Sequence, residues 1–180
     1  ELIRFGPEGD GGYLIPDDLE GIEACFSPGV STASGFEKDC ANQNMKVFLA
    51  DASVSAPAQK HDLFDFIPMF VGSINNDNYL TLDKWVNSKL PNSNSDLLLQ
   101  MDIEGSEYEA FHSLSEDTIK RFRIMVIEFH DLDEIWNYPF FIILSRVFKK
   151  ILQTHDCVHI HPNNITNTKK LNGIETVQAM

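Results

Sequence analysis

The sequence predicts an α/β domain built around a largely parallel β-sheet. Short apolar runs alternate with segments of helical periodicity along most of the chain. Several of these runs end in a carboxylate, an imidazole or a glycine, which is typical of strands that deliver functional groups to one edge of a parallel sheet. The 180 residues suit a single domain with a sizeable core, so we expect residues 1–180 to fold as one unit.

The expected elements follow one another in a regular order. Residues 1–20 should form a lead-in hairpin or loop, because EGDGGYLI (8–15) contains D-G and G-G turn signals. The expected strands are the apolar runs 22–30, 46–53, 65–74, 97–103, 122–130, 157–161 and 173–180. The expected helices are 34–44, 81–90, 106–114 and 135–153.

Three local signals refine these elements. Ser34 with Glu37, and Ser106 with Glu109, have the spacing of a helix capping box. Pro68 places the strand 65–74 at a sheet edge or at a strand start, because proline cannot donate to a strand ladder. The helix 135–153 carries a proline near its first turn, where proline is tolerated.

Composition excludes several classes of protein. The net charge is −13 and no run of Lys or Arg is longer than a pair, so a nucleic-acid partner is not expected. No run of about 18 apolar residues exists, which argues against a membrane span. Three widely separated cysteines favour buried free thiols in a reducing compartment, and we therefore expect a cytoplasmic protein. The chain opens on Glu1 and not on Met, which leaves room for a preceding segment.

The stretch LLLQMDIEGSEYEAF (97–111) carries the most informative carboxylate. Asp102 ends a buried-looking strand, where an uncompensated charge is costly, so it should face a cation, a donor-rich ligand or a metal. Glu107 and Glu109 are more simply explained as charges that favour the start of a helix. Glu104 stays open between a supporting role for Asp102 and a metal ligand.

Two further strand ends bring imidazoles. Glu128 and His130 lie on one face of the expected strand 122–130, and His159 and His161 lie on one face of 157–161. Asp102, Glu128 and His159 together could hold a divalent ion. The alternative is a pair of histidines hydrogen-bonded at the end of a sheet.

A ligand-binding interpretation also fits the strand end at Asp51. In dinucleotide-type folds an acid at this position accepts hydrogen bonds from ribose hydroxyls. The loop SPGVSTASG, which contains Gly29, should bring backbone amides close to a ligand, but it lacks G-x-G-x-x-G and so argues against a nicotinamide cofactor. Asp10 and Gly11 lie either in a plain turn or in a loop that contacts the ligand.

Taken in order, DGGYLIPDDL, SPGVSTASGFEKDCA, VFLADAS, LLLQMDIEGSEYEAF, RIMVIEFH and VHIHPNN resemble the FkbM-type family of S-adenosylmethionine-dependent methyltransferases. The resemblance extends from about residue 10 to residue 164, and its most specific piece is D-I-E-G-x-E-Y (102–108). It implies a Rossmann-like class I methyltransferase fold, which is a three-layer sandwich with a mostly parallel seven-stranded sheet whose last strand is antiparallel.

The resemblance also implies where S-adenosylmethionine would bind. Gly29 and its loop would face the methionine part, and Asp10 and Gly11 would contribute from the lead-in segment. The remaining positions that it implies are Asp51 at the ribose, Gly72 and Ser73 at the adenine, and Asp102 beside the sulfonium, and Ala52 next to Asp51 is a further candidate cofactor-binding residue.

The function expected from the resemblance is O-methylation of a hydroxyl on a sugar or natural-product acceptor, either a small molecule or a glycan. A hydroxyl must lose its proton during the transfer, so a base or a metal is needed. We expect Asp102 to position cofactor and acceptor, with His130 or His159 as the base. The alternatives are a metal-dependent hydrolase with an Asp/Glu/His site and a non-catalytic ligand-binding domain.

Overall fold

The central element is a five-stranded parallel sheet. The computed structural model describes residues 1–92, 94–163, 165 and 167–180. The sheet consists of β3 (Ile22–Pro28), β4 (Lys46–Ala50), β5 (Phe64–Ile67), β8 (Asp96–Met101) and β9 (Phe122–Ile127). Their order is β5-β4-β3-β8-β9, and every pairing is parallel. The predicted α/β class with a parallel sheet is confirmed.

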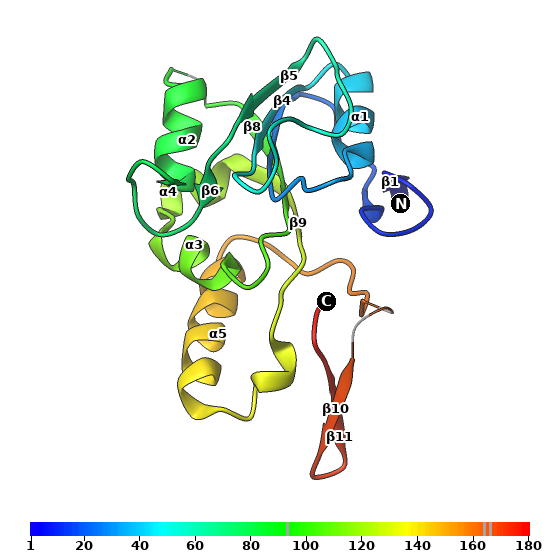
Figure 1. Cartoon of the computed structure of the whole chain (residues 1–180), viewed down its shortest axis with the longest axis vertical. Coiled ribbons are helices and arrows are strands. Elements are labelled where there is room, and N and C mark those ends of the chain that lie inside the picture. Colours follow the sequence, from blue (N-terminus) through cyan, green and yellow to red (C-terminus); the bar gives the residue numbers. More distant parts are fainter. Residues whose placement is uncertain (93, 164, 166) are drawn as a thin grey trace.

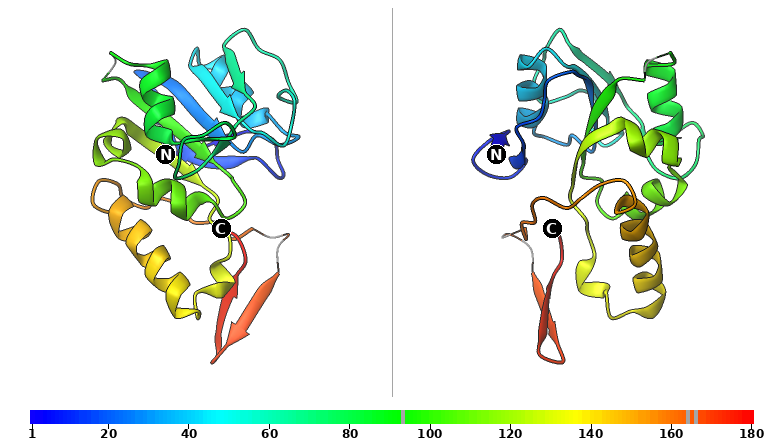
Figure 2. Two further views of the ribbon diagram at one scale, coloured as in Figure 1. Left: turned by 60° about the vertical axis from the view of Figure 1, so that its left-hand side comes forward. Right: turned by 180° about the vertical axis from the view of Figure 1, so that it is seen from behind.

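Helices cover both faces of this sheet, as Figure 1 and the two views of Figure 2 show. One face is covered by α1 (Gly35–Asn42) and by the antiparallel hairpin of β1 (Leu2–Phe5) and β2 (Tyr13–Pro16). The other is covered by helices α2 to α5, whose bounds are Leu82–Lys89, Glu107–Ser113, Glu116–Arg121 and Tyr138–Ile151.

The near-continuous apolar sequence of the central strands follows from this arrangement. In β3, Ala24 and Phe26 pack on the side of α2, whereas Cys25 between them packs on the side of α1. Because successive side chains point to opposite faces, a strand covered on both sides needs apolar residues at every position. Trp85 of α2 packs edge-on against Phe26, with ring centroids 5.1 Å apart.

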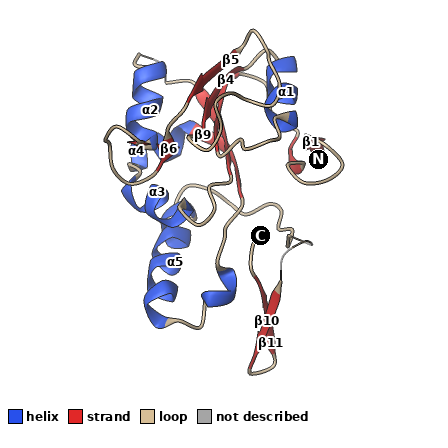
Figure 3. Cartoon of the chain, in the orientation of Figure 1, coloured by secondary structure: helices blue, strands red, loops and turns tan. Residues whose placement is uncertain are grey.

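The prediction of a seven-stranded sheet with an antiparallel last strand is wrong for the described residues. Residues 157–161 lie in a loop, drawn as such in Figure 3, with Val158 and Ile160 exposed. The predicted strand 173–180 contains β11 (Ile174–Val177), but β11 pairs with β10 (Thr168–Leu171) in a separate antiparallel hairpin. Asn164, at the end of the VHIHPNN motif, lies outside the described residues.

The last residues of the chain nevertheless pair with the continuation of β9. The Phe129 amide donates to the Met180 carbonyl (2.8 Å), and the Met180 amide donates back to the Phe129 carbonyl (3.0 Å). The Leu132 amide donates to the Gln178 carbonyl at 3.0 Å. Ala179 is fully buried as a result. The predicted antiparallel last strand is therefore reduced to a short contact with the carboxyl end of β9.

Other predicted elements are shorter or divided. The expected strand 65–74 is split at Pro68 into the edge strand β5 and β6 (Phe70–Val71), and β6 pairs with β7 (Tyr79–Leu80) in its own parallel pair. The expected helix 135–153 is shortened to α5, with proline in its first turn as predicted, and a 3-10 turn at Leu132–Glu134 precedes it.

Neither predicted capping box forms. The Ser34 hydroxyl accepts a hydrogen bond from the Ala58 amide (3.2 Å) and does not cap α1, and Ser106 makes no side-chain cap. The side chains that cap helices here are Thr81 at α2 and Ser115 at α4, each accepting from the amide three residues on. Glu37 and Glu107, which are acids in the first turns of α1 and α3, point inward and are buried.

Within the described residues, no helix combines the length and the apolar character needed to cross a membrane. Cys25 and Cys40 are buried free thiols, as expected, whereas Cys157 is exposed.

The Gly29→Ala substitution tests the closest backbone approach in the fold. Gly29 has φ +86°, and a Cβ at this position would lie 1.6 Å from the Asp102 carbonyl oxygen. We expect a loss of at least about 2 kcal/mol in the free energy of unfolding, from backbone strain and from separation of the two loops. Urea denaturation measures this loss.

The matched control is Gly9→Ala, because a Cβ at Gly9 has no neighbour within 4 Å. It should change the free energy of unfolding by no more than about 0.5 kcal/mol. Equal effects at Gly29 and Gly9 would contradict the steric explanation.

Candidate active site

Two adjoining cavities open at the carboxyl ends of the central strands. The larger, about 300 Å³, lies over the ends of β3, β4 and β8 and extends to β6 and β7. The smaller, about 80 Å³, extends toward α1 and the turn before β2. Gly29, Ser31 and Asp102 line both cavities, so the two form one continuous cleft. This is the edge at which the sequence predicted functional groups to converge.

Asp51 organises the floor of the larger cavity. Its carboxylate is buried and accepts hydrogen bonds from the Ser31 amide (2.8 Å), the Ser53 amide (2.7 Å) and the Ser53 hydroxyl (2.6 Å). These bonds tie the loop after β3 to the loop after β4. Because a carboxylate can accept about four hydrogen bonds, one acceptor position is left for a ligand.

The far wall of the larger cavity is aromatic. Phe70 and Tyr79 line it from β6 and β7, with ring centroids 5.6 Å apart. The predicted adenine contacts Gly72 and Ser73 line neither cavity, nor does Ala52. The Ser73 hydroxyl instead donates to Glu109 at 3.1 Å.

The smaller cavity contains the predicted pair Asp10 and Gly11, together with Tyr13. Gly11 has φ +76°, which a glycine adopts without strain. The turn EGDGGYLI therefore contributes to the cleft and does more than reverse the chain.

A buried polar chain lies beneath the smaller cavity. The Ser27 hydroxyl is 2.6 Å from a Glu37 oxygen and 2.7 Å from the Gln100 side-chain oxygen. One hydroxyl proton cannot serve both oxygens, and burial raises the pKa of Glu37. A protonated Glu37 that donates to Ser27, which in turn donates to Gln100, satisfies all three groups.

Asp102 stands at the junction of the two cavities. Its Oδ1 atom is buried and has no hydrogen-bond partner among the described residues. Burial and the nearby charges of Glu128, Glu104 and Glu107 raise the pKa of Asp102 from 3.8 to about 7, against the lowering effect of His130. A carboxylate in this position is short of positive charge.

His130 lies behind Asp102 and lines neither cavity. Its Nε2 atom is 3.7 Å from Asp102 Oδ1 and 3.5 Å from Glu104, and its Nδ1 atom is 3.1 Å from Glu107. Burial lowers the pKa of His130, but the hydrogen bond and charge of Glu107, with the charges of Asp102 and Glu104, raise it to about 9. At neutral pH the ring is an imidazolium.

Glu107 is a site residue that the sequence interpretation missed. Its carboxylate is fully buried and accepts from the amides of Ile103 (3.0 Å) and Gly105 (3.1 Å) as well as contacting His130. Glu107 could have been recognised as a partner of His130 because the two motifs follow consecutive strands that lie next to each other in the sheet. Neighbouring parallel strands that end in D-I-E-G-x-E and E-F-H bring these acids to the imidazole.

Glu128 is satisfied by other partners. Tyr13 donates to its Oε2 atom at 3.3 Å, and the Asn163 side-chain amide donates to its Oε1 atom at 2.7 Å. Burial and the charges of Asp102 and Glu128 raise the pKa of Tyr13 well above its usual range, so the hydroxyl keeps its proton. Glu128 thus anchors the lead-in hairpin and the C-terminal segment to β9.

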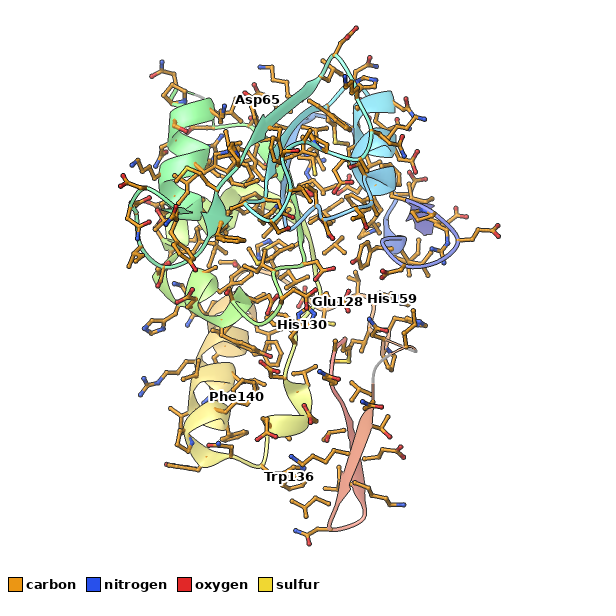
Figure 4. All side chains as sticks on the ribbon, in the orientation of Figure 1. Asp65, Glu128, His130, Trp136, Phe140 and His159 are labelled. Carbon is orange, nitrogen blue, oxygen red and sulfur yellow. The ribbon has the colours of Figure 1, made fainter. Side chains whose placement is uncertain are left out.

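The predicted trio Asp102, Glu128 and His159 is not brought together as a ligand set. Figure 4 shows Glu128 and His130 at the end of β9, with His159 on the segment that leads to the β10–β11 hairpin. His159 is exposed and stacks on His161 with ring centroids 6.3 Å apart. Among the described residues, three side chains whose ligand atoms all lie within 4.8 Å of one another are those of Asp102, Glu104 and His130. An imidazolium offers no lone pair, so a metal there would first have to displace its proton.

The fold and the cleft define an α/β protein that binds a ligand over the carboxyl ends of parallel strands. The family model of the methyltransferase FkbM domain matches residues 29–158, which is more than half of the chain, and the chain belongs to this family. No curated protein and no solved structure matches the chain. Membership confirms the predicted family and implies S-adenosylmethionine as the methyl donor.

The substitution Asp102→Asn tests the electrostatic description of the cleft. The folded-state pKa of Asp102 lies above its ordinary value, so the native state holds a proton that the unfolded state releases. Stability from this group is therefore present at low pH and is lost as pH rises from about 4 to about 7. The unfolding free energy of the variant minus that of the wild type should grow over the same interval.

Urea denaturation at several pH values measures this difference. The charge-matched control is Asp117→Asn, at an exposed position in the first turn of α4. A difference for Asp102→Asn that stays constant between pH 4 and pH 7 would contradict the description.

Proposed function

We propose that this chain is an S-adenosylmethionine-dependent O-methyltransferase whose acceptor is a hydroxyl group on a sugar or natural product. The observation that carries the proposal is the buried Asp102 oxygen at the junction of the two cavities, to which none of the described residues makes a hydrogen bond. A cationic ligand centre beside this carboxylate would relieve the charge deficit. Hydroxyl acceptors are suggested by the resemblance to the family and by the carboxylate available to take a proton.

The residues of the cleft fit the donor. Asp51 has an acceptor position left for a ribose hydroxyl, and Phe70 and Tyr79 offer an apolar wall to a flat base. Asp10 and Gly11 line the smaller cavity, where the amino-acid end of the donor would lie. The donor would then not contact Gly72, Ser73 or Ala52 directly, and these residues would support the residues that line the cavities.

When bound, S-adenosylmethionine supplies a methyl carbon on a positively charged sulfur, and the oxygen–carbon bond forms as the carbon–sulfur bond breaks. Asp102 would accept the hydroxyl proton of the acceptor, because a base with a pKa near 7 is matched to neutral pH. His130 is protonated at this pH and suits the role of a charge behind Asp102 better than that of a base. His159 as a base stays a prediction, and its exposed position offers no support.

A titration with S-adenosylhomocysteine tests donor binding. Ligand that binds only the native state raises the midpoint of thermal unfolding. We expect the Asp51→Asn variant to bind at least about tenfold more weakly, because an amide loses the charge and one acceptor oxygen of the carboxylate. Calorimetry gives both dissociation constants.

The matched control is Asp65→Asn. Asp65 is a half-exposed carboxylate on the edge strand β5, and it pairs with Lys89 outside the cleft. The affinity of the Asp65→Asn variant for S-adenosylhomocysteine should equal that of the wild type. Absence of S-adenosylhomocysteine binding to the wild type would overturn the proposal.

Methyl transfer itself is tested by a screen of hydroxyl-bearing carbohydrates and natural products with labelled donor. Donor binding without transfer to any acceptor would favour the non-catalytic alternative. Hydrolysis that needs a metal but no donor would favour the hydrolase alternative. Full activity in EDTA would remove the metal from the mechanism.

A further inference from the structure

The environment of Glu107 goes beyond what the start of a helix requires. Charges that only complement a helix dipole lie at the surface, as Glu116 does in the first turn of α4, where it pairs with Lys120. Glu107 is fully buried at the start of α3. Its two oxygens accept from the amides of Ile103 and Gly105, and Oε1 also contacts His130 Nδ1. This environment aligns the carboxylate with one atom of one imidazole.

We propose that Glu107 is a positioning residue that holds His130 with Nδ1 protonated and Nε2 facing Asp102, and that the Glu107–His130 pair thereby controls the proton-accepting carboxylate of the cleft. The role of Asp102 in this statement rests on the proposed function. The arrangement of Glu107 and His130 does not rest on it.

The geometry of the ring leaves little freedom. Glu107 approaches Nδ1 at 3.1 Å, and a carboxylate with two amide donors cannot also supply a proton, so the proton of this contact belongs to the imidazole. The backbone carbonyl of His130 accepts from the Tyr108 hydroxyl at 2.6 Å, which fixes the main chain. Tyr108 is itself buried between Phe129 and Phe140. Residues of α3 therefore hold both the ring and the backbone carbonyl of His130.

The charged groups around the ring act from three sides. Glu107 faces Nδ1 from α3, and Asp102 and Glu104 face Nε2 from the loop after β8. Glu128, at the end of β9, acts on Asp102, and Tyr13 from β2 donates to Glu128. Glu107, Asp102 and Glu104 each favour the protonated ring, and Glu107 does so by direct hydrogen bonding as well as by charge.

The consequence for Asp102 follows from its position next to the ring. The imidazolium is the one effect among those acting on Asp102 that lowers its pKa, because the neighbouring acids and burial raise it. Loss of the Glu107 charge would allow His130 to become neutral at lower pH. Asp102 would then lose its counter-charge. Loss of Glu107 also removes a direct effect that raises the pKa of Asp102, but His130 acts on Asp102 more strongly than Glu107 does, so Asp102 would stay protonated to higher pH and less of it would be free to accept a proton.

Nitrogen-detected NMR of the histidine rings of the wild-type chain, titrated from pH 5 to pH 10, tests the proposal. The six histidines are distinguished with single His→Gln variants. The expected result is a His130 ring that is protonated at Nδ1 throughout and titrates at Nε2. In Glu107→Gln, whose side chain has nearly the same shape, the His130 midpoint should fall by at least about one pH unit.

The charge-matched control is Glu116→Gln, which should leave the His130 midpoint unchanged. A wild-type ring that is protonated at Nε2 above its midpoint would overturn the proposal, and this measurement needs no variant that might fail to fold. A folded Glu107→Gln variant with an unaltered His130 midpoint would overturn it as well.

A kinetic measurement separates this proposal from the proposed function. If methyl transfer is found, Glu107→Gln should lower kcat at least about tenfold, while the KM for the donor changes little. The acidic limb of the plot of kcat against pH should shift to higher pH. An unchanged dependence of kcat on pH would overturn the proposal that the Glu107–His130 pair governs the protonation of Asp102. Failure of the wild type to bind S-adenosylhomocysteine would overturn the proposed function alone, because the NMR result does not depend on the donor.

Discussion

The cleft depends on the contact between Gly29 and the backbone of Asp102. The Gly29 amide donates to the Ala50 carbonyl (3.0 Å), and the Asp102 amide donates to the Pro28 carbonyl (3.3 Å), so three strand ends meet within a few atoms. The left-handed conformation of Gly29 lets the loop after β3 turn directly over the loop after β8. Asp51 and Asp102 face the same space because of this contact.

Charge in the cleft is distributed unequally between its two ends. At the Asp51 end, the carboxylate accepts three hydrogen bonds from two amides and a hydroxyl, which fix its position and leave one acceptor position toward the cavity. At the Asp102 end, Glu107, Asp102 and Glu104 face one imidazolium, and Glu128 adds its charge beside Asp102. A buried oxygen of Asp102 has no hydrogen bond within the part of the chain that the structure describes. Such a concentration of unfavourable charge is common where a protein sacrifices stability for chemistry.

Much of the fold could be predicted from the sequence, because buried parallel strands have nearly continuous apolar runs. The strands at Phe26, Phe48 and Leu99 satisfy this rule, and their polar ends identified Gly29, Asp51 and Asp102 as cleft residues. The rule failed at residues 157–161. Alternation of Val158 and Ile160 with histidines describes a surface that a strand could bury, but no neighbouring strand is present among the described residues to bury it.

The site was only partly predictable for a related reason. Glu107 and Glu37 fit a local explanation as acids at the start of a helix, and that explanation was sufficient without any distant partner. Their true partners, His130 and Ser27, are 23 and 10 positions away and are brought near by strand order. A local pattern records which helix end a carboxylate favours, but the direction in which the side chain points is decided by packing.

The pairing of β3 with β8 also sets the order in which the molecule can assemble. Ser27 and Gln100 touch in the folded protein but are 73 positions apart in the chain. While the chain is being synthesised, β3 can pair with β4 soon after both emerge, but its other edge stays uncovered until β8 follows. The cleft draws walls from both sides of this gap, so the wall from the end of β8 is missing until that strand has been synthesised. A ligand that contacts both walls therefore meets a complete site only after β8 has been synthesised.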